Sequence, residues 1–138
     1  MVKSVLIYGA EIWSLYEEDR RRINETDMGA LRRSARISKV DRKTNEYIRG
    51  KMEAQDMILD EITRKQLIWY GHVERMDPTR LPKIMIHWKP EGRKKRSRPR
   101  RTWKDGIYTA MSVRDLRTGE WNNRRQWNMA VGRRRQTF

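Results

Sequence analysis

Apolar residues recur at helical spacing along much of the chain. Ile58, Ile62, Val73 and Met76 fall on one face of a helix predicted over residues 56–76. Acidic side chains near its start suit the positive end of the helix dipole. The same reasoning predicts four further helices, over residues 15–35, 44–51, 102–113 and 119–131. The pattern therefore predicts a mainly α-helical fold, a small irregular helical bundle.

Local signals predict where these elements begin and end. Ser14, followed by Glu17, matches a capping box at the start of the helix over 15–35. Thr102 is a suitable N-cap for the helix over 102–113. Asp77-Pro78 should end the long helix, because the residue before a proline disfavours helical backbone, and Leu81-Pro82 indicates another turn.

Two apolar stretches remain ambiguous from the pattern alone. Residues 2–13 are mostly apolar and fit a buried helix or a strand equally well. Residues 84–88 form a shorter apolar piece, which also fits either type.

Composition makes folding marginal. Leu, Ile, Val and Phe make up only 25 of 138 residues, and a fraction below about 20% with high net charge is typical of disorder. Six Trp, five Tyr and eight Met add apolar bulk, so one small core is possible. We divide the chain by composition into a helical region over 1–88, a basic loop over 89–104, and short helices with a basic tail over 105–138.

Positive charge is concentrated in the second half of the chain. The whole sequence carries +15, of which residues 70–138 carry +13. Residues 89–104 hold nine Lys and Arg against Glu91 alone, and Pro90, Gly92 and Pro99 preclude a continuous helix there. We expect this segment to be an extended basic loop.

A polyanion, most commonly nucleic acid, is the expected partner of such a charge. Lys and Arg side chains neutralise phosphates and release counterions without reading sequence. The predicted contact residues are Arg93, Lys94, Lys95, Arg96, Arg98, Arg100, Arg101, Lys104, Arg133, Arg134 and Arg135. The alternatives are a solvated charge run or a nuclear-import signal. Basic charge that continues to Arg135 favours nucleic acid.

Several classes of protein are excluded. Without cysteine there is no disulfide, iron–sulfur cluster or zinc finger, and with two histidines there is no multi-histidine metal site. No apolar run approaches a membrane span, and residues 1–7 lack the features of a signal peptide. We therefore expect no cofactor and an intracellular, nuclear setting.

Few residues could carry catalysis. Asp56 and Asp60 lie one helical turn apart and, with His72, could form a residual nuclease site. Helix-terminus electrostatics explain the two aspartates more simply, and a lone histidine beside aromatics is usually a packing residue. The tryptophans could stack on bases, but at helical spacing they are more typical of a core, namely Trp69, Trp103, Trp121 and Trp127.

The order of several short blocks resembles a known family. Tyr8-Gly9-Ala10-Glu11-Ile12-Trp13 is followed by Leu31-Arg32-Arg33 and by Leu67-Ile68-Trp69-Tyr70-Gly71-His72-Val73-Glu74-Arg75-Met76. Arg98-Pro99-Arg100-Arg101-Thr102-Trp103 and Asn123-Arg124, with Trp127, complete the series. Together they resemble the region downstream of the polymerase palm in endonuclease–reverse transcriptases of insect-type non-LTR retrotransposons. Ser97 and Ala30 depart from that pattern, where the family commonly has Gly and Cys.

This resemblance implies a thumb-like region that helps to hold RNA or target DNA during target-primed reverse transcription. It implies no catalytic residue, because neither the palm nor the endonuclease maps onto this chain, which would be a fragment or a degenerate copy. The polymerase palm is then a further expected partner, and docking against it is the alternative function. The motif residues would be structural, namely Trp13, Trp69, Gly71, His72, Met76, Trp103 and Trp127.

Overall fold

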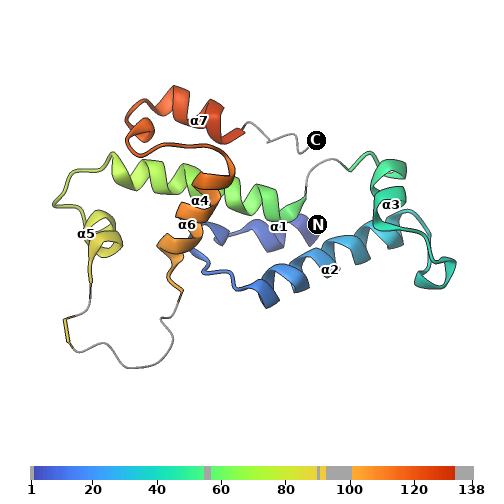
Figure 1. Ribbon diagram of the computed structural model, residues 1–138. Coiled ribbons are helices and arrows are strands. Elements are labelled where there is room, and N and C mark those ends of the chain that lie inside the picture. The colour runs from blue at the N-terminus through green and yellow to red at the C-terminus, as the bar shows by residue number, and fades with distance from the viewer. Residues whose placement is uncertain (1, 55–56, 90, 93–100, 133–138) are drawn as a thin grey trace. The chain divides into compact units, whose positions relative to one another are not determined.

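The chain folds into α-helices and short 3-10 helices, as predicted (Figure 1). The computed structural model describes residues 2–54, 57–89, 91–92 and 101–132, and within these ranges no strand is formed. Two compact units divide the chain, residues 1–63 and residues 64–138. The three-part division by composition stays a prediction.

The first unit contains the longest of the described helices, Glu17–Ser34. It contains α1 (Val2–Ile7), α2 (Glu17–Ser34), α3 (Asn45–Lys51) and the 3-10 helices η1 (Ala10–Ile12) and η2 (Lys39–Asp41), and α4 (Ile58–Glu74) begins in it. Its apolar core consists of Ile7, Ala10, Ile23, Ile58 and Ile62. Residues 2–13, ambiguous in sequence, are therefore helical, with α1 and η1 separated at Gly9, whose φ of 67° is left-handed.

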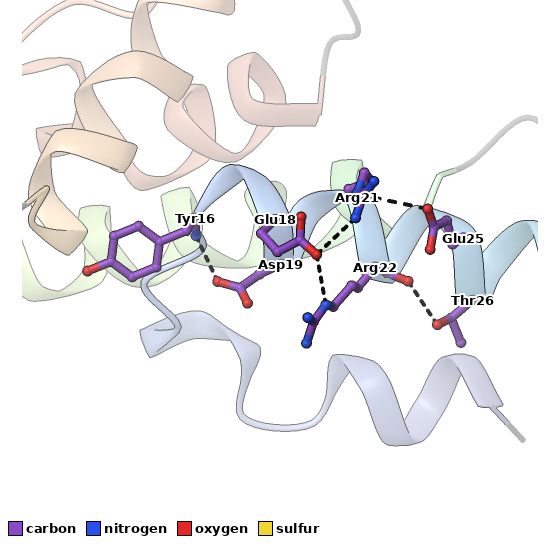
Figure 2. A network of polar contacts seen from close by, with 7 residues as sticks. All are labelled: Tyr16, Glu18, Asp19, Arg21, Arg22, Glu25 and Thr26. Atoms are coloured by element: carbon purple, nitrogen blue, oxygen red, sulfur yellow. Dashed lines mark hydrogen bonds and ion pairs between the residues drawn. The ribbon is translucent and has the colours of Figure 1, made fainter.

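Helix α2 has a mostly charged surface, and only Ile23 and Met28 are buried along its 18 residues. Figure 2 shows Glu18 paired with Arg21 and Arg22, each at 3.0 Å. Such one-turn pairs add a few tenths of a kcal/mol each. The predicted cap at Ser14 is wrong. The helix begins after Tyr16, whose backbone N–H donates to Asp19 Oδ2 at 3.0 Å, since that carboxylate lies three residues on.

The second unit packs around the latter part of α4. It adds α5 (Leu81–His87), α6 (Trp103–Val113), η3 (Glu120–Asn122) and α7 (Arg124–Gly132). Its core consists of Leu67, Tyr70, Ile107, Met111, Leu116, Trp127 and Val131. These side chains come from α4, α6 and α7 and, for Leu116, from the segment after α6, so the complete core needs all three helices.

Most predicted helices are confirmed, with shifts at their ends. Thr102 caps α6 and accepts from the Asp105 backbone N–H at 3.3 Å, as the sequence predicted. The turn predicted at Leu81-Pro82 is wrong, because Pro82 lies in the first turn of α5, where its missing N–H costs nothing. The ambiguous residues 84–87 belong to the same helix.

Candidate nucleic-acid interface

The predicted contact residues fall into two groups. Arg101 is exposed in the segment before α6, and Lys104 lies half-buried on the first turn of α6. The remainder lie outside the described residues, namely Arg93, Lys94, Lys95, Arg96, Arg98, Arg100, Arg133, Arg134 and Arg135. The structure describes the two ends of the basic segment 89–104 together with α4, α5 and α6 around them. We call this part of the second unit the frame.

That frame is centred on the side chain of Glu74, at the end of α4, which is only 7% exposed. Lys83 Nζ lies 3.4 Å from Glu74 Oε2 and also donates to the Glu74 backbone carbonyl. His87 Nε2 lies 3.1 Å from Oε1 and 3.4 Å from Oε2 of the same carboxylate. One buried carboxylate therefore fixes two residues of α5 against the end of α4.

His87 also joins the two ends of the basic segment. Its Nδ1 lies 3.3 Å from Nζ of Lys104, on the first turn of α6. A carboxylate can only accept and an ammonium group can only donate, so in this arrangement Nε2 of His87 donates and Nδ1 accepts. The predicted loop thus leaves α5 and enters α6 at neighbouring points.

Tyr70 and Tyr108 lie beside this polar cluster. Burial raises the pKa of the Tyr70 hydroxyl well above its usual range, and the negative charge of Glu74 and hydrogen bonding with Tyr108 and Glu74 act in the same direction. The two rings meet edge to face with their centroids 6.5 Å apart. Lys104 Nζ lies 5.7 Å from the centre of the Tyr108 ring. The Tyr70 hydroxyl is therefore held in its protonated form beside the Glu74 carboxylate.

The most distinctive sequence block has a packing explanation. Trp127, on α7, is fully buried and donates its indole Nε1–H to the Leu67 carbonyl at 3.0 Å. A Cβ atom on Gly71 would lie 2.3 Å from that nitrogen. Only glycine at position 71 lets the indole reach the helix backbone, so Gly71 and Trp127 form a close packing contact between α4 and α7.

The other motif residues take supporting positions. Trp103 is half-buried against the second core, with its ring centroid 6.3 Å from that of Tyr70. Trp69 is half-buried and its ring lies 5.6 Å from the exposed His72 ring. Met76 is half-buried just beyond α4, and Trp13 packs on the first core.

The nuclease alternative gains no support from geometry. Asp60 lies in the first turn of α4, where a negative charge favours the helix dipole, and Asp56 is outside the described residues. Within the part of the chain that the structure describes, no three His, Asp or Glu side chains gather as a metal site would require.

Two cationic features were not predicted. In the second unit, Arg75 Nη1 donates to the Trp121 carbonyl at 2.6 Å, and burial together with the nearby charge of Arg124 lowers the pKa of Arg75. In the first unit, a groove of about 400 Å³ is lined by four cationic side chains and Glu25. Those cations are Arg32, Lys39, Arg42 and Lys43. No single motif marks either feature, because each depends on residues brought together by the fold.

A third unpredicted feature lies on α5. Three large apolar side chains are exposed along it and a fourth directly after it, namely Leu81, Ile84, Met85 and Trp88. Their spacing was visible in the sequence, but such spacing normally indicates a buried face.

Among the described helices none is long and apolar enough to cross a membrane.

Comparison with known proteins gives one relative and no assigned activity. No protein family and no solved structure matches the chain. Over 149 residues, covering 99% of this chain, it is 26% identical to an uncharacterized, transposon-derived protein of Caenorhabditis elegans. The chain spans about half of that relative, 53% of its length. The similarity supports a transposon-related origin for this chain.

Proposed function

We propose that the chain binds nucleic acid as a non-catalytic region of a retrotransposon reverse transcriptase. The observation that carries the proposal is the charge of +13 on residues 70–138. The transposon-derived relative supports an origin in a mobile element. The blocks around Trp69-Tyr70-Gly71-His72 and Arg98-Pro99-Arg100 support the assignment to a reverse transcriptase of the non-LTR type.

In this function the second unit presents cations and performs no chemistry. Glu74 and His87 hold the ends of the basic segment together. The side chain of Arg101, near one of these ends, is exposed to solvent. Neighbouring ends suit a segment that contacts one stretch of phosphodiester backbone. RNA or target DNA would be held here, inside a nucleus. A polymerase elsewhere in a longer protein would copy the RNA into DNA.

The direct test is the salt dependence of binding by the 138-residue chain. If about six phosphates are contacted, affinity for a short RNA or DNA should fall about a thousandfold between roughly 50 and 200 mM salt. Fluorescence anisotropy with labelled oligonucleotides measures this over a series of salt concentrations. Affinity that is independent of salt would contradict the proposal.

The site within the chain is tested by charge removal. Replacing Arg93, Lys94, Lys95 and Arg96 by Ser should weaken binding. The slope of log affinity against log salt should become less steep, by up to the amount expected for four phosphate contacts. A matched control removes four exposed cations of the first unit, Arg21, Arg22, Arg33 and Lys51. Equal losses in both variants would show that only net charge matters, and an unchanged affinity in the first would discard the site.

A second candidate function is docking against the polymerase palm of a longer protein. Three apolar side chains of the first unit, Val5, Tyr8 and Ile12, are exposed in and after α1. An exposed apolar group of this kind is typical of an interface. If docking were needed for folding, the isolated chain should melt without cooperativity. A single cooperative thermal transition of the 138 residues would count against this function.

A further inference from the structure

A groove in the first unit gathers cationic side chains on one surface. It has a volume of about 400 Å³ and is lined by residues of α2, of η2 and of the segment that leads into α3. Four of the lining side chains are cations, Arg32, Lys39, Arg42 and Lys43, and one is a carboxylate, Glu25. We refer to this site as the α2 groove. All of its lining residues belong to the first unit.

The cations of the α2 groove are not neutralised by the protein itself. Within the described part of the chain, none of the four forms an ion pair with a carboxylate. Asp27 is paired with Arg49 at 3.7 Å. Glu25 lies 4.0 Å from Nε of Arg21, which is outside the groove lining (Figure 2). An anion that enters the groove therefore meets like charges that no side chain compensates.

The two asparagines of the lining add neutral donors. Arg32 Nη2 donates to Asn45 Oδ1 at 3.0 Å and to the Lys43 carbonyl at 2.9 Å. Arg49 Nη2 donates to Asn24 Oδ1 at 3.3 Å. Because a guanidinium group can only donate, both amide oxygens are engaged, and the Nδ2 groups are the donors that remain for a ligand. Cations and amide donors together fit a group with several negatively charged oxygens, as a phosphate has.

The size of the groove indicates a ligand larger than a phosphate ion. A volume of about 400 Å³ equals the space of about thirteen water molecules in the liquid, and small-molecule sites begin at about 300 Å³. The lining also has an uncharged part, because it includes the buried Met28 and Gly29. The space beside Gly29 is open, since no atom lies within 4 Å of the position of its Cβ. A nucleotide matches this combination, because it joins a phosphate to an uncharged sugar and base.

We propose that the α2 groove binds a nucleotide through its phosphate, either a free nucleotide or one unit of an RNA or DNA strand. Arg32 meets the phosphate from a fixed position, because two hydrogen bonds already orient its guanidinium group. Lys39 and Arg42 add charge from exposed positions, and the sugar and base lie beside Met28. The inference goes beyond the proposed function, because it needs none of the cations of residues 70–138.

The experiment is an NMR titration of the 138-residue chain with adenosine 5′-monophosphate. Adenosine, which lacks the phosphate, and inorganic phosphate are the reference ligands. The amide signals of residues 39–45 should shift with the nucleotide, which should bind more tightly than inorganic phosphate, and adenosine should leave these signals in place.

Charge removal from the groove tests the site. The variant Lys39→Gln with Arg42→Asn should weaken nucleotide binding by about five- to thirtyfold. Asn is chosen because Arg42 has a left-handed φ of 48°, which Asn tolerates. The matched control is Lys51→Gln with Arg36→Asn, since both residues are exposed outside the groove lining and Arg36 has a φ of 55°. The control should keep the affinity within about twofold, because distant exposed charges are screened by salt.

A second pair of variants adds a charge instead of removing one. Gly29 and Gly50 both lie in helices of the first unit, and no atom is within 4 Å of either Cβ position. Gly29→Glu places a carboxylate at the groove and should abolish nucleotide binding, whereas Gly50→Glu should not. Far-UV circular dichroism should be the same in both variants, so that a loss of binding is not a loss of folding.

A titration with penta-adenylate that lacks terminal phosphates distinguishes the two sources of the nucleotide. Tighter binding than that of the mononucleotide assigns the groove to a strand, and binding of the mononucleotide alone assigns it to a free nucleotide. Equal affinity for inorganic phosphate and the mononucleotide refutes the nucleotide ligand, and equal losses in the groove and control variants refute the site. If neither nucleotide ligand shifts residues 39–45, the inference fails. Salt-dependent binding of longer RNA or DNA in that case leaves the proposed function standing.

Discussion

Replacing Gly71 by Ala tests the contact that joins α4 to α7. The added Cβ would lie 2.3, 2.7 and 2.9 Å from Nε1, Cδ1 and Cε2 of the Trp127 indole. All three distances are shorter than side-chain carbons tolerate. Trp127 is fully buried and held by its bond to the Leu67 carbonyl, so the ring cannot move aside without leaving both its site and its hydrogen-bond acceptor.

The expected cost combines three effects. Overpacking of a tight core costs about 1–3 kcal/mol. Displacement of the indole loses a buried hydrogen bond, about 1 kcal/mol. Ala is better than Gly within a helix by about 1 kcal/mol, which offsets part of the loss. We therefore expect Gly71→Ala to lower the free energy of unfolding by about 1–3 kcal/mol.

Gly106→Ala is the matched control, because Gly106 lies within α6 of the same unit and nothing is within 4 Å of the position of its Cβ. It should raise the free energy of unfolding by up to about 1 kcal/mol. The two variants thus differ in sign. Urea unfolding followed by tryptophan fluorescence and near-UV circular dichroism measures both. A Gly71→Ala protein as stable as the unaltered chain, with the same near-UV spectrum, would refute the close-approach argument.

Two predictions concern pH. The pKa of Tyr70 is raised above its ordinary 10.0, so its contribution to stability is complete below pH 10.0 and is lost as the pH rises further. Alkaline unfolding, followed by circular dichroism, should therefore depend less steeply on pH in Tyr70→Phe, and equal curves would contradict this. Hydrogen bonds from Thr102 lower the pKa of Asp105 below its ordinary 3.8, so the cap is intact above pH 3.8 and is lost as the pH falls through the lower folded value. The chemical shift of the Thr102 amide in NMR should change with pH as Asp105 titrates, and this change should be absent in Asp105→Ala. A shift that changes in the same way in both proteins would count against the cap.

The helices with strong local signals were predictable from the sequence. Thr102 and Asp105 satisfy each other within four residues, so α6 could be placed almost to the residue. The cap at Ser14 failed because Asp19 competes at the same spacing from Tyr16. Two capping patterns that overlap by two residues differ only in local geometry, which the sequence does not display.

The candidate site was less predictable, because its contacts are distant in the chain. His87 meets Lys104 across the basic segment, and Glu74 meets both Lys83 and His87. Spacing along one helix says nothing about such pairs. The exposure of Leu81, Ile84 and Met85 on α5 could not be predicted for a related reason. Apolar residues at helical spacing normally face a core, and only the anchoring of the opposite face shows that these face solvent.

The bond between Trp127 and the Leu67 carbonyl makes the second unit depend on its final helix. Its partners are 60 positions apart in the chain. During synthesis, α4 leaves the ribosome long before α7 exists, so this unit cannot close its core until Val131 has been translated. A chain that ended before Arg124 would lack both Trp127 and Val131, and the interior of this unit would stay open.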